Sequence, residues 1–341
     1  MAMDIAIDLG SDRIRVYMPG KGKVLDEASV ITYDVDTGEI FAVGDAAYKM
    51  IGKTPYGVRA LHPVDGGVIA RSDLVDNMVE ILLRETCPVK VVMPRVVTAV
   101  PCGLTEVEKR AMVNAVSSFG ARKVYLIESP KAAALGCGVD VTSPHGVFIA
   151  DIGSGTADIA VISLGGLTVS RSVKRAGSAM DEEIVKFIRK KYNLVIGTNT
   201  AEACKQAVGC IKLPQEPKTF RLKGRDAVTG LPKFVEVTGE DILPAIEETA
   251  RDIVLAVKDV LELTPPELAG DIYNDGIILT GGLSKLPGLA KTISEETRLR
   301  VRVHKFAQDC VIMGCGKAIR FIGEQERGTL RGGLSPLMAA Y

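Results

Sequence analysis

The sequence has no surplus of charge of either sign, because its 341 residues include 42 lysines and arginines and 42 aspartates and glutamates. A protein that binds nucleic acid needs excess positive charge for the phosphates, so we expect no nucleic-acid partner. No apolar run reaches the about 18 residues of a membrane span, since Lys90, Pro94 and Arg95 interrupt the best candidate, 89–100. The N-terminus has no basic segment or cleavage site of the signal-peptide type. These absences predict a soluble cytoplasmic protein.

Cysteine and histidine are few and scattered. The seven cysteines are an odd number, lie in apolar runs and form no C-x-x-C pair, which is typical of reduced thiols in a cytoplasmic core. The three histidines are far apart in the sequence, so they predict no zinc site.

The pattern that is present alternates short β-branched runs with amphipathic helices, which predicts a mixed α/β fold. Two segments about 140 residues apart resemble each other: an apolar run leads into Asp8–Ser11, and another leads into Asp151–Thr156. Each is followed by an alternating segment, as expected for a strand, an Asp-x-Gly turn and a second strand. This internal duplication predicts two equivalent lobes facing each other across a cleft.

Helix signals lie between and after the two copies. Thr105 and Glu108 form a capping-box pattern, and 181–192 ends in basic residues that favour a helix C-terminus. Apolar residues recur at helical spacing through 240–263, which predicts a helix packed on one face.

The glycine-rich turns carry the chemistry, because no Walker A sequence, Ser-His-Asp set or H-E-x-x-H motif is present. Gly10, Gly153 and Gly155 allow backbone N–H groups to approach phosphate oxygens. A dinucleotide fold would need G-x-G-x-x-G running directly into a helix, and neither turn has that spacing. Two hairpins instead favour a triphosphate held from both sides, with Asp8 and Asp151 holding water molecules on Mg²⁺.

A third glycine turn, 280–283, follows an apolar strand and precedes a helix, a geometry suited to ligand contact at a helix N-terminus. Each turn alone is more often structural than functional. Three of them at lobe-scale spacing favour a binding site.

Several longer motifs lead to a family. They are Asp4–Gly10, Pro94–Val97 with Val100 and Pro101, Thr105–Glu108, Tyr125–Glu128, Asp151–Thr156, Ile188–Asn193, Gly224–Asp226 with Val228–Pro232, Thr264–Leu268 and Thr280–Gly282. Over roughly residues 4–322 the chain resembles the superfamily of actin, the sugar kinases and the heat-shock chaperones. Within it, the segments around 188–232 are similar to the MreB family of bacterial actin homologues.

The resemblance implies an actin-like, ribonuclease H-like duplicated α/β fold with a nucleotide cleft between two lobes. The first lobe is expected over 1–140, with an insertion at about 31–70 and completion by about 309–322. The second is expected over 141–308, with an insertion at about 182–240. The Gly-rich stretch 323–341, which also contains Ser and Pro and lacks periodicity, is expected to be a flexible tail.

The resemblance also implies a cytoplasmic cytoskeletal protein that binds ATP and Mg²⁺. Such a protein forms filaments at the inner face of the membrane and works with cell-wall synthesis proteins to set cell shape. It assigns Ser11, Asp12 and Arg13 to the first phosphate loop. Catalytic roles fall to Asp8, Asp151 and Thr156, with the threonine orienting the attacking water and the two carboxylates as the metal site. The remaining cofactor-binding positions are Gly153, Ser154, Gly155 and Thr156 for phosphate, Glu202 and Lys205 for the ribose and adenine, and Gly281, Gly282, Leu283 and Ser284 for the other side of the nucleoside.

One departure from the family concerns hydrolysis. Where the family carries a second glutamate that positions the lytic water, this chain has Ser129. A serine hydroxyl is shorter and uncharged, so at most slow ATP hydrolysis is expected. Ser129 also suits the N-cap of a helix starting at Pro130. Glu128 would compensate only if the loop rearranged.

A second departure is the charged first loop. Asp12 would repel a triphosphate unless a metal or an arginine neutralised it. Arg13 and Arg15, two apart on a predicted strand, point to one face. There they either contact phosphates or form a solvated edge pair near Asp12, and both alternatives stay open.

Membrane contact is predicted at an apolar loop. Val91, Val92 and Met93 lie between Lys90 and Arg95, a combination suited to the interface with anionic lipid. The alternative is the buried start of a strand over 96–100.

Four functions compete. A nucleotide-controlled filament protein is favoured by the family-specific segments, and a filament subunit that modulates an active paralogue without hydrolysing ATP is favoured by Ser129. A small-molecule kinase of the same fold would need a base on a dedicated loop, which is not evident. A chaperone-like module would need a peptide-binding domain, for which the two lobes leave no residues.

Overall fold

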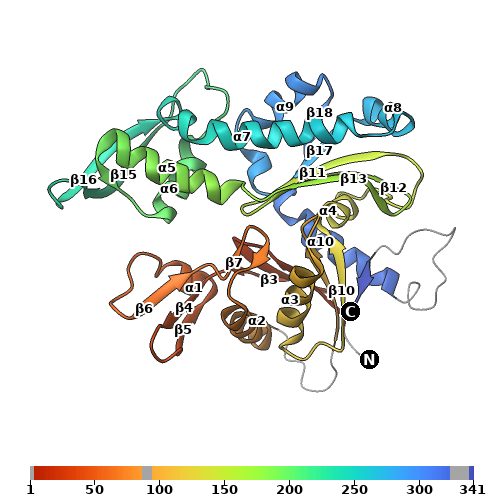
Figure 1. The fold of residues 1–341 in the computed structure, drawn as a ribbon, viewed down its shortest axis with the longest axis horizontal. Helices are drawn as coiled ribbons and strands as arrows, with labels where there is room; N and C mark the ends of the chain where they lie inside the picture. The colour runs from red at the N-terminus through yellow and green to blue at the C-terminus, as the bar shows by residue number, and fades with distance from the viewer. Residues whose placement is uncertain (1–3, 87–93, 323–337) are drawn as a thin grey trace.

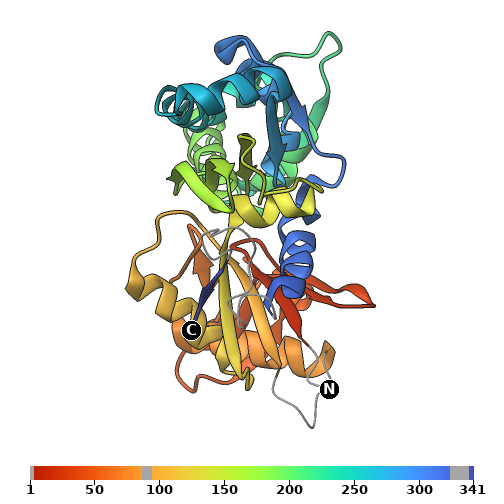
Figure 2. The same cartoon turned by 90° about the vertical axis from the view of Figure 1, so that its right-hand side faces the viewer.

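The computed structural model describes residues 4–86, 94–322 and 338–341, which form two lobes with two helices at their junction (Figure 1, Figure 2). The first lobe contains a six-stranded sheet in the order β19-β10-β9-β1-β2-β3. Its strands are β1 (Ile5–Leu9), β2 (Arg13–Met18), β3 (Gly22–Ala28), β9 (Arg95–Val100), β10 (Lys123–Glu128) and β19 (Ala339–Ala340). β1 pairs antiparallel with β2 and parallel with β9.

The second lobe repeats this arrangement with a five-stranded sheet in the order β13-β12-β11-β17-β18. Its strands are β11 (Val147–Ile152), β12 (Ala157–Ser163), β13 (Gly166–Val173), β17 (Ile277–Thr280) and β18 (Val301–Val303). β11 pairs antiparallel with β12 and parallel with β17, as β1 does with β2 and β9. The two-lobed duplication predicted from the sequence is therefore confirmed.

Helices cover these sheets, and smaller sheets extend from each lobe. The helices are α1 (Gly44–Tyr48), α2 (Ser72–Thr86), α3 (Glu106–Ser117), α4 (Ser129–Gly136), α5 (Gly177–Tyr192), α6 (Thr198–Val208), α7 (Gly239–Glu262), α8 (Pro266–Asp275), α9 (Leu289–Thr297) and α10 (Cys310–Ala318), with 3₁₀ turns at Leu283–Lys285, Ala307–Asp309 and Ile319–Phe321. The smaller sheets are β5-β4-β6, β7-β8 and β14-β15-β16, built from β4 (Ile31–Asp34), β5 (Ile40–Val43), β6 (Val58–Leu61), β7 (Val64–Asp65), β8 (Val68–Ile69), β14 (Leu194–Val195), β15 (Thr219–Asp226) and β16 (Pro232–Thr238).

The helix signals in the sequence act as expected. The Thr105 hydroxyl accepts the Glu108 N–H, and the Glu108 carboxylate accepts the Thr105 N–H, so α3 begins with a complete capping box. α7 buries the predicted apolar stripe and is capped in the same way by Thr238 and Asp241. Pro244 is the sixth residue of α7, past the first turn, so the Glu240 carbonyl has no N–H partner four residues on.

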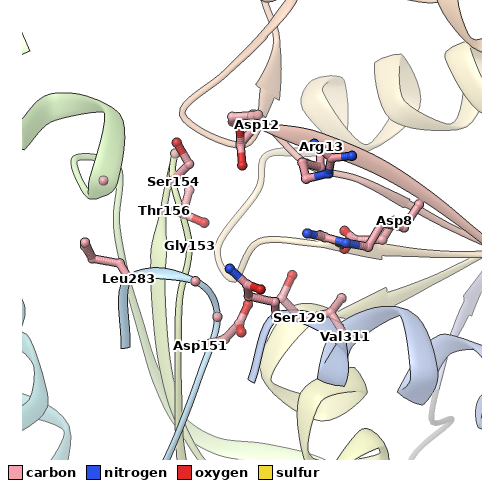
Figure 3. Close-up of a pocket in the computed structure, with 18 of the residues that line it drawn as sticks. Asp8, Asp12, Arg13, Ser129, Asp151, Gly153, Ser154, Thr156, Leu283 and Val311 are labelled. Atoms are coloured by element: carbon pink, nitrogen blue, oxygen red, sulfur yellow. Dashed lines mark ion pairs between the residues drawn. The ribbon is translucent and has the colours of Figure 1, made fainter. Parts of the chain in front are cut away.

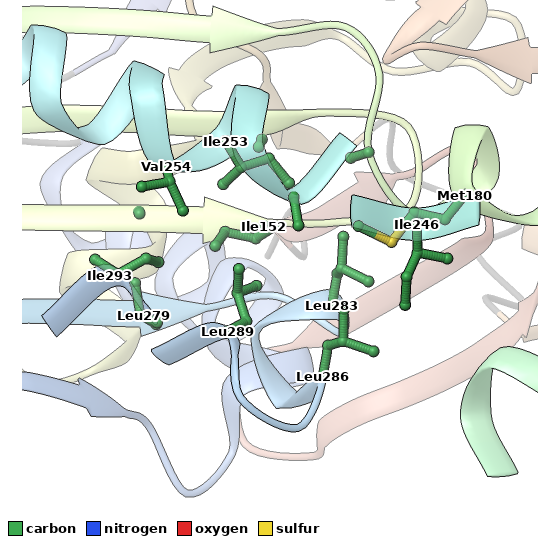
Figure 4. Close-up of a cluster of buried hydrophobic side chains, with 14 of the residues drawn as sticks. Ile152, Met180, Ile246, Ile253, Val254, Leu279, Leu283, Leu286, Leu289 and Ile293 are labelled. Atoms are coloured by element: carbon green, nitrogen blue, oxygen red, sulfur yellow. The ribbon is translucent and has the colours of Figure 1, made fainter. Parts of the chain in front are cut away.

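In the described part of the chain, three large apolar cores and a small one around Ala28, Val30 and Ala47 hold the molecule together. The second lobe packs α7 and α9 against its sheet around residues such as Ile152, Ile253 and Leu279 (Figure 4). The first lobe has its own core around β1, β9, α2 and α3. A third core combines residues of both lobes with α4 and α10. Each of these helices packs against the sheet of the other lobe. α4 follows β10 of the first lobe and contacts β11 and β12 of the second sheet, whereas α10 follows β18 of the second lobe and contacts β1 and β2 of the first.

The end of the chain differs from the expected flexible tail. Ala339–Ala340 pairs antiparallel with β10, and Met338 is buried. For the last four residues the expectation is wrong, because an edge of the first sheet offers them backbone hydrogen bonds. Residues 323–337 lie outside the described part of the chain.

The described helices include none that is both long and apolar enough to cross a membrane. The predicted lipid-contacting residues Val91, Val92 and Met93 lie outside the described residues. β9 begins at Arg95, just beyond them.

Candidate functional site

The turns of the two matching hairpins face each other across a cavity of about 530 Å³ between the lobes (Figure 3). Asp8 lines it at the end of β1, and Asp151 lines it at the end of β11. Both carboxylates therefore open into one hollow, although 143 residues separate them in the sequence (151 − 8).

Small residues let the two turns approach. The Gly10 N–H bonds to the Arg13 carbonyl at 3.1 Å, and the Gly153 N–H bonds to the Thr156 carbonyl at 2.8 Å, closing each hairpin tightly. A Cβ on Gly155 would lie 2.3 Å from the Ser11 Oγ of the opposite lobe. Glycine is required at this closest approach.

The two carboxylates have different partners. Oδ2 of Asp8 lies 3.5 Å from Nη1 of Arg15, on the neighbouring strand. Oδ1 of Asp151 accepts a 2.7 Å hydrogen bond from the Thr280 hydroxyl on β17. Burial raises the pKa of Asp8 in spite of Arg15, and burial raises the pKa of Asp151 to about 7. A cation between the hairpins would favour the charged form of both carboxylates, and oxygen donors are what Mg²⁺ prefers, so this donor set fits magnesium.

The arginines of the first hairpin are held by acidic side chains. Arg13 donates to the Asp26 carboxylate at 2.5 Å and to its carbonyl at 2.6 Å, and lies 3.4 Å from Asp45. Arg15 lies between Asp8 and Asp26, 3.4 Å from the latter. The two arginines share one face, as predicted, and Arg13 pairs with Asp26 and Asp45.

Asp12 faces the cavity from the first turn, opposite Ser154 and Thr156 (Figure 3). Burial, and then the charge of Glu202, raise its pKa. The acidic character predicted for this loop is therefore directed into the cavity.

β12, which follows the second turn, contains a residue that the sequence interpretation missed. The Thr156 hydroxyl donates to Oδ2 of Asp158 at 2.8 Å, and the Cys102 N–H donates to Oδ1 at 2.9 Å. Asp158 is buried, which raises its pKa. It orients Thr156, and a signal was present, since residues two apart on a strand share a face.

Ser129 lines the cavity as the first residue of α4. Its hydroxyl donates to the Val100 carbonyl at 3.1 Å, and the N-cap of α4 is Glu128. The prediction that Ser129 caps the helix is therefore wrong. The Glu128 carboxylate pairs with Lys131 at 2.7 Å, and Glu128 is not among the residues that line the cavity, so the loop has not rearranged to compensate.

α6 supplies the predicted pair Glu202 and Lys205, and both line the cavity. Lys205 donates to the Gly177 carbonyl at 2.7 Å and to Asp181 at 2.6 Å. Burial raises the pKa of Asp181 to about 7 although Lys205 opposes the shift. Glu202 accepts a 2.8 Å hydrogen bond from the Tyr48 hydroxyl, which crosses from the first lobe.

The third glycine turn closes the cavity beyond β17. Gly281 has φ of +80°, and a Cβ there would lie 2.3 Å from the Ile152 carbonyl, so glycine is needed. Gly281, Gly282 and Leu283 line the cavity, as predicted. Ser284 does not: it is buried and its hydroxyl donates to the Gly281 carbonyl at 2.6 Å. Its position in the motif is correct, but its side chain stabilises the turn.

Other lining residues gave no local signal in the sequence. They are brought to the cavity from separate elements: Lys23, Asp26, Gly67, Gly177, Gln206, Lys285, Gln308, Asp309 and Val311. Sequence reasoning found the contiguous turns, whereas these residues reach the site only through the packing of the lobes.

Comparison with known proteins gives consistent matches over almost the whole chain. A sequence model of the family described as MreB/Mbl protein matches residues 2–327. Cell shape-determining protein Mbl of Bacillus cereus is 40% identical over 332 residues, 97% of this chain and 99% of the relative. Cell shape-determining protein MreB of Escherichia coli is 38% identical over 325 residues, 94% of each.

Solved structures give the same result for the fold. MreB5 of Spiroplasma citri bound to ADP has a TM-score of 0.90 at 35% identity and covers 96% of this chain and 99% of its own. The same protein bound to AMPPNP also has a TM-score of 0.90. The MamK double helical filament has a TM-score of 0.80 at 22% identity over 94% of this chain and 99% of its own. The predicted actin-like fold is therefore confirmed.

Proposed function

Because the chain belongs to the MreB/Mbl family of actin-like proteins, we propose that it is a cell shape-determining protein that binds ATP with Mg²⁺ between its lobes and polymerises into filaments. The observation that carries this proposal is the pair of matching hairpins that open their carboxylates, Asp8 and Asp151, into one cavity. The relatives with ADP and AMPPNP support a nucleotide as the ligand.

In this proposal each part of the cavity has a role. The backbone N–H groups that follow Gly153 in the second turn, and those of the Ser11 turn, bind phosphate, a role that glycine permits by letting the ligand approach the main chain. Asp8 and Asp151 hold the magnesium ion through its water ligands, and the ion neutralises phosphate charge. Glu202 and Lys205 contact the ribose and adenine, and Gly281, Gly282 and Leu283 contact the opposite side of the nucleoside.

Hydrolysis is proposed to be slow. Thr156 is oriented by Asp158 and would hold the attacking water, but the facing residue Ser129 donates its hydroxyl to the Val100 carbonyl. A hydroxyl used in this way provides no base for the water. The same observation favours a second candidate, a filament subunit that binds ATP without hydrolysing it and modulates an active paralogue.

Filaments of this protein are proposed to lie in the cytoplasm at the inner face of the cell membrane, with lipid contact through Val91, Val92 and Met93. Cell-wall synthesis proteins are the proposed partners. Support comes from the family and from the apolar, cation-flanked sequence of this loop.

The test combines pelleting and electron microscopy with phosphate release, in ATP, ADP and no nucleotide. ATP-dependent filaments with slow release support the first proposal, and filaments with no release support the second. Failure to bind nucleotide, or transfer of phosphate to a small metabolite, contradicts both. Asp151→Ala should abolish filament formation that depends on Mg²⁺-ATP. Asp36 is an exposed aspartate on a turn of the first lobe, so Asp36→Asn serves as the matched control.

A further inference from the structure

Three metal-ligating side chains meet at the junction of the lobes, outside the roles assigned above. Cys137 follows α4, His304 follows β18 and Cys310 begins α10. Their ligand atoms all lie within 4.8 Å of one another. Separation along the sequence predicts no zinc site from the histidines, but the fold brings His304 beside two thiols that are 173 residues apart.

The distances match a tetrahedral metal site. The two Sγ atoms are 3.6 Å apart, and Sγ of Cys310 is 3.1 Å from Nδ1 of His304. With Zn–S near 2.3 Å and Zn–N near 2.0–2.1 Å, tetrahedral angles require about 3.7 Å between sulfurs and about 3.5 Å between sulfur and nitrogen. These two distances lie within about 0.4 Å of the tetrahedral values, and all three ligand atoms lie within 4.8 Å of one another.

The backbone holds the two cysteines in place. A Cβ on Gly136 would lie 1.9 Å from the Cys310 carbonyl, and one on Gly314 would lie 1.6 Å from the Ala132 carbonyl, so α4 and α10 touch main chain to main chain. Lys317 also donates to the carbonyls of Leu135 and Gly136 at the end of α4. The thiols are thus presented by a rigid helix pair, as a preformed site requires.

The donors are chemically ready for a cation. The Cys137 thiol donates a hydrogen bond to Sγ of Cys310, and thiolate is the form in which cysteine binds metal. Nδ1 of His304 accepts the Phe306 N–H at 3.2 Å, and a metal would replace that N–H. Cys137 and His304 are half-buried, which leaves an entry path, whereas Cys310 is buried.

We propose that Cys137, His304 and Cys310 form a binding site for a thiophilic divalent cation of the zinc class, with water in the fourth position. Two sulfurs and an imidazole select such an ion over Mg²⁺, which prefers oxygen. The ion would tie the end of α4, which packs on the second sheet, to the start of α10, which packs on the first. Because Asp309 and Val311 flank Cys310 and line the nucleotide cavity, the metal would sit directly behind that cavity.

The test uses the full chain, reduced and freed of metal by a chelator, with Co²⁺ as the probe and no nucleotide. One equivalent of Co²⁺ should produce thiolate-to-cobalt charge-transfer absorption and the visible bands of a tetrahedral site, and Zn²⁺ should displace it. Cys137→Ser, His304→Gln and Cys310→Ser should each weaken binding by more than about 100-fold, beyond the range typical of groups outside the ligand set.

Cys315→Ala is the matched control, because it removes a buried thiol from the same helix outside the cluster. It should bind Co²⁺ as the unaltered chain does. Zn²⁺ should raise the melting temperature of the unaltered chain and of Cys315→Ala, but not of His304→Gln, whose half-exposed side chain makes a folded variant the expected result. A reduced chain without the charge-transfer band, or a band that survives in Cys137→Ser, overturns the proposal. Neither readout depends on nucleotide binding, so its outcome is separate from that of the proposed function.

Discussion

The hairpins of the two lobes share one topology but neutralise their carboxylates differently. In the first lobe, Asp8 lies beside the guanidinium of Arg15 on the paired strand. In the second, Asp151 receives a hydrogen bond from a neutral hydroxyl, that of Thr280. The first hairpin thus carries a positive charge that neutralises its own carboxylate, whereas the charge of Asp151 depends more strongly on a cation from solution for neutralisation.

The turns differ in the same sense. The first turn carries Asp12 and Arg13, and Arg13 is held by the acidic residues Asp26 and Asp45. The second turn, 153–156, has small and uncharged residues, which let a ligand approach its main chain closely. A duplicated backbone can therefore keep its pairing pattern while its two copies place different charges around the cavity.

The largest expected effect comes from giving the first lobe the carboxylate that it lacks opposite Thr156. Ser129→Glu should raise phosphate release by about 100-fold, since a positioned general base typically contributes 10²–10⁴-fold. Single-turnover phosphate release measures this directly. Ser129→Gln, of the same shape without charge, should stay near the unaltered rate; equal release by all three chains would show that the missing carboxylate is not the cause.

The unequal roles of the two arginines give the next effect. Arg15→Gln removes the cation beside Asp8 and should weaken Mg²⁺-ATP binding by about tenfold or more, because a hydrogen bond to a charged group contributes about 1.5–3 kcal/mol. Arg13→Gln should have a smaller effect, because Asp26 and Asp45 already occupy its guanidinium. Fluorescent nucleotide titration compares them, and an equal loss in both variants would contradict the distinction.

The carboxylates themselves predict a pH dependence. Burial raises the pKa of Asp151 from 3.8 to about 7, so between these values the folded protein holds a proton that the unfolded chain has lost. Stability without nucleotide therefore falls as the pH rises from about 4 to about 7. Asp151→Asn cannot ionise, so its melting temperature should exceed that of the unaltered chain by several degrees at pH 8 and by little at pH 4.

Asp8→Asn is the matched control for this measurement. It removes the partner of Arg15 and leaves that guanidinium without its Asp8 contact. At pH 8 the melting temperature of Asp8→Asn should therefore rise less than that of Asp151→Asn, or should fall below that of the unaltered chain. A melting temperature of Asp151→Asn that follows the unaltered chain at every pH would contradict the burial of an ionising carboxylate.

The smallest expected effect concerns the contact across the mouth of the cleft. Tyr48→Phe removes the hydrogen bond to Glu202 and should speed nucleotide release by about two- to tenfold, the range of one hydrogen bond of 0.5–1.5 kcal/mol. Stopped-flow displacement measures the rate. Tyr56→Phe, a fully exposed control in the same lobe, should leave it unchanged; slower release by Tyr48→Phe would show that this contact does not hold the cleft closed.

Local sequence was sufficient for the elements and the main turns. The hairpins at 5–17 and 147–162, the capping box of α3 and the apolar stripe of α7 are each determined by residues that are neighbours along the chain. The same holds for the turn glycines Gly10, Gly153, Gly155, Gly281 and Gly282, which line the cavity. Side-chain roles within these turns were less predictable: Ser284 occupies the predicted turn, but its hydroxyl is directed to the Gly281 carbonyl and away from the cavity.

By itself, the sequence determined that two similar α/β halves exist and that each has a glycine turn preceded by an aspartate, because backbone conformation and periodicity are local properties. Only the tertiary structure decided which distant side chains meet. Tyr48 contacts Glu202, 154 residues away in the sequence, because α1 and α6 face each other across the cleft. Cys137 contacts Cys310, 173 residues away, because α4 and α10 pack together at the junction of the lobes. Such meetings depend on how the lobes pack against each other, and no periodicity along one segment encodes that packing.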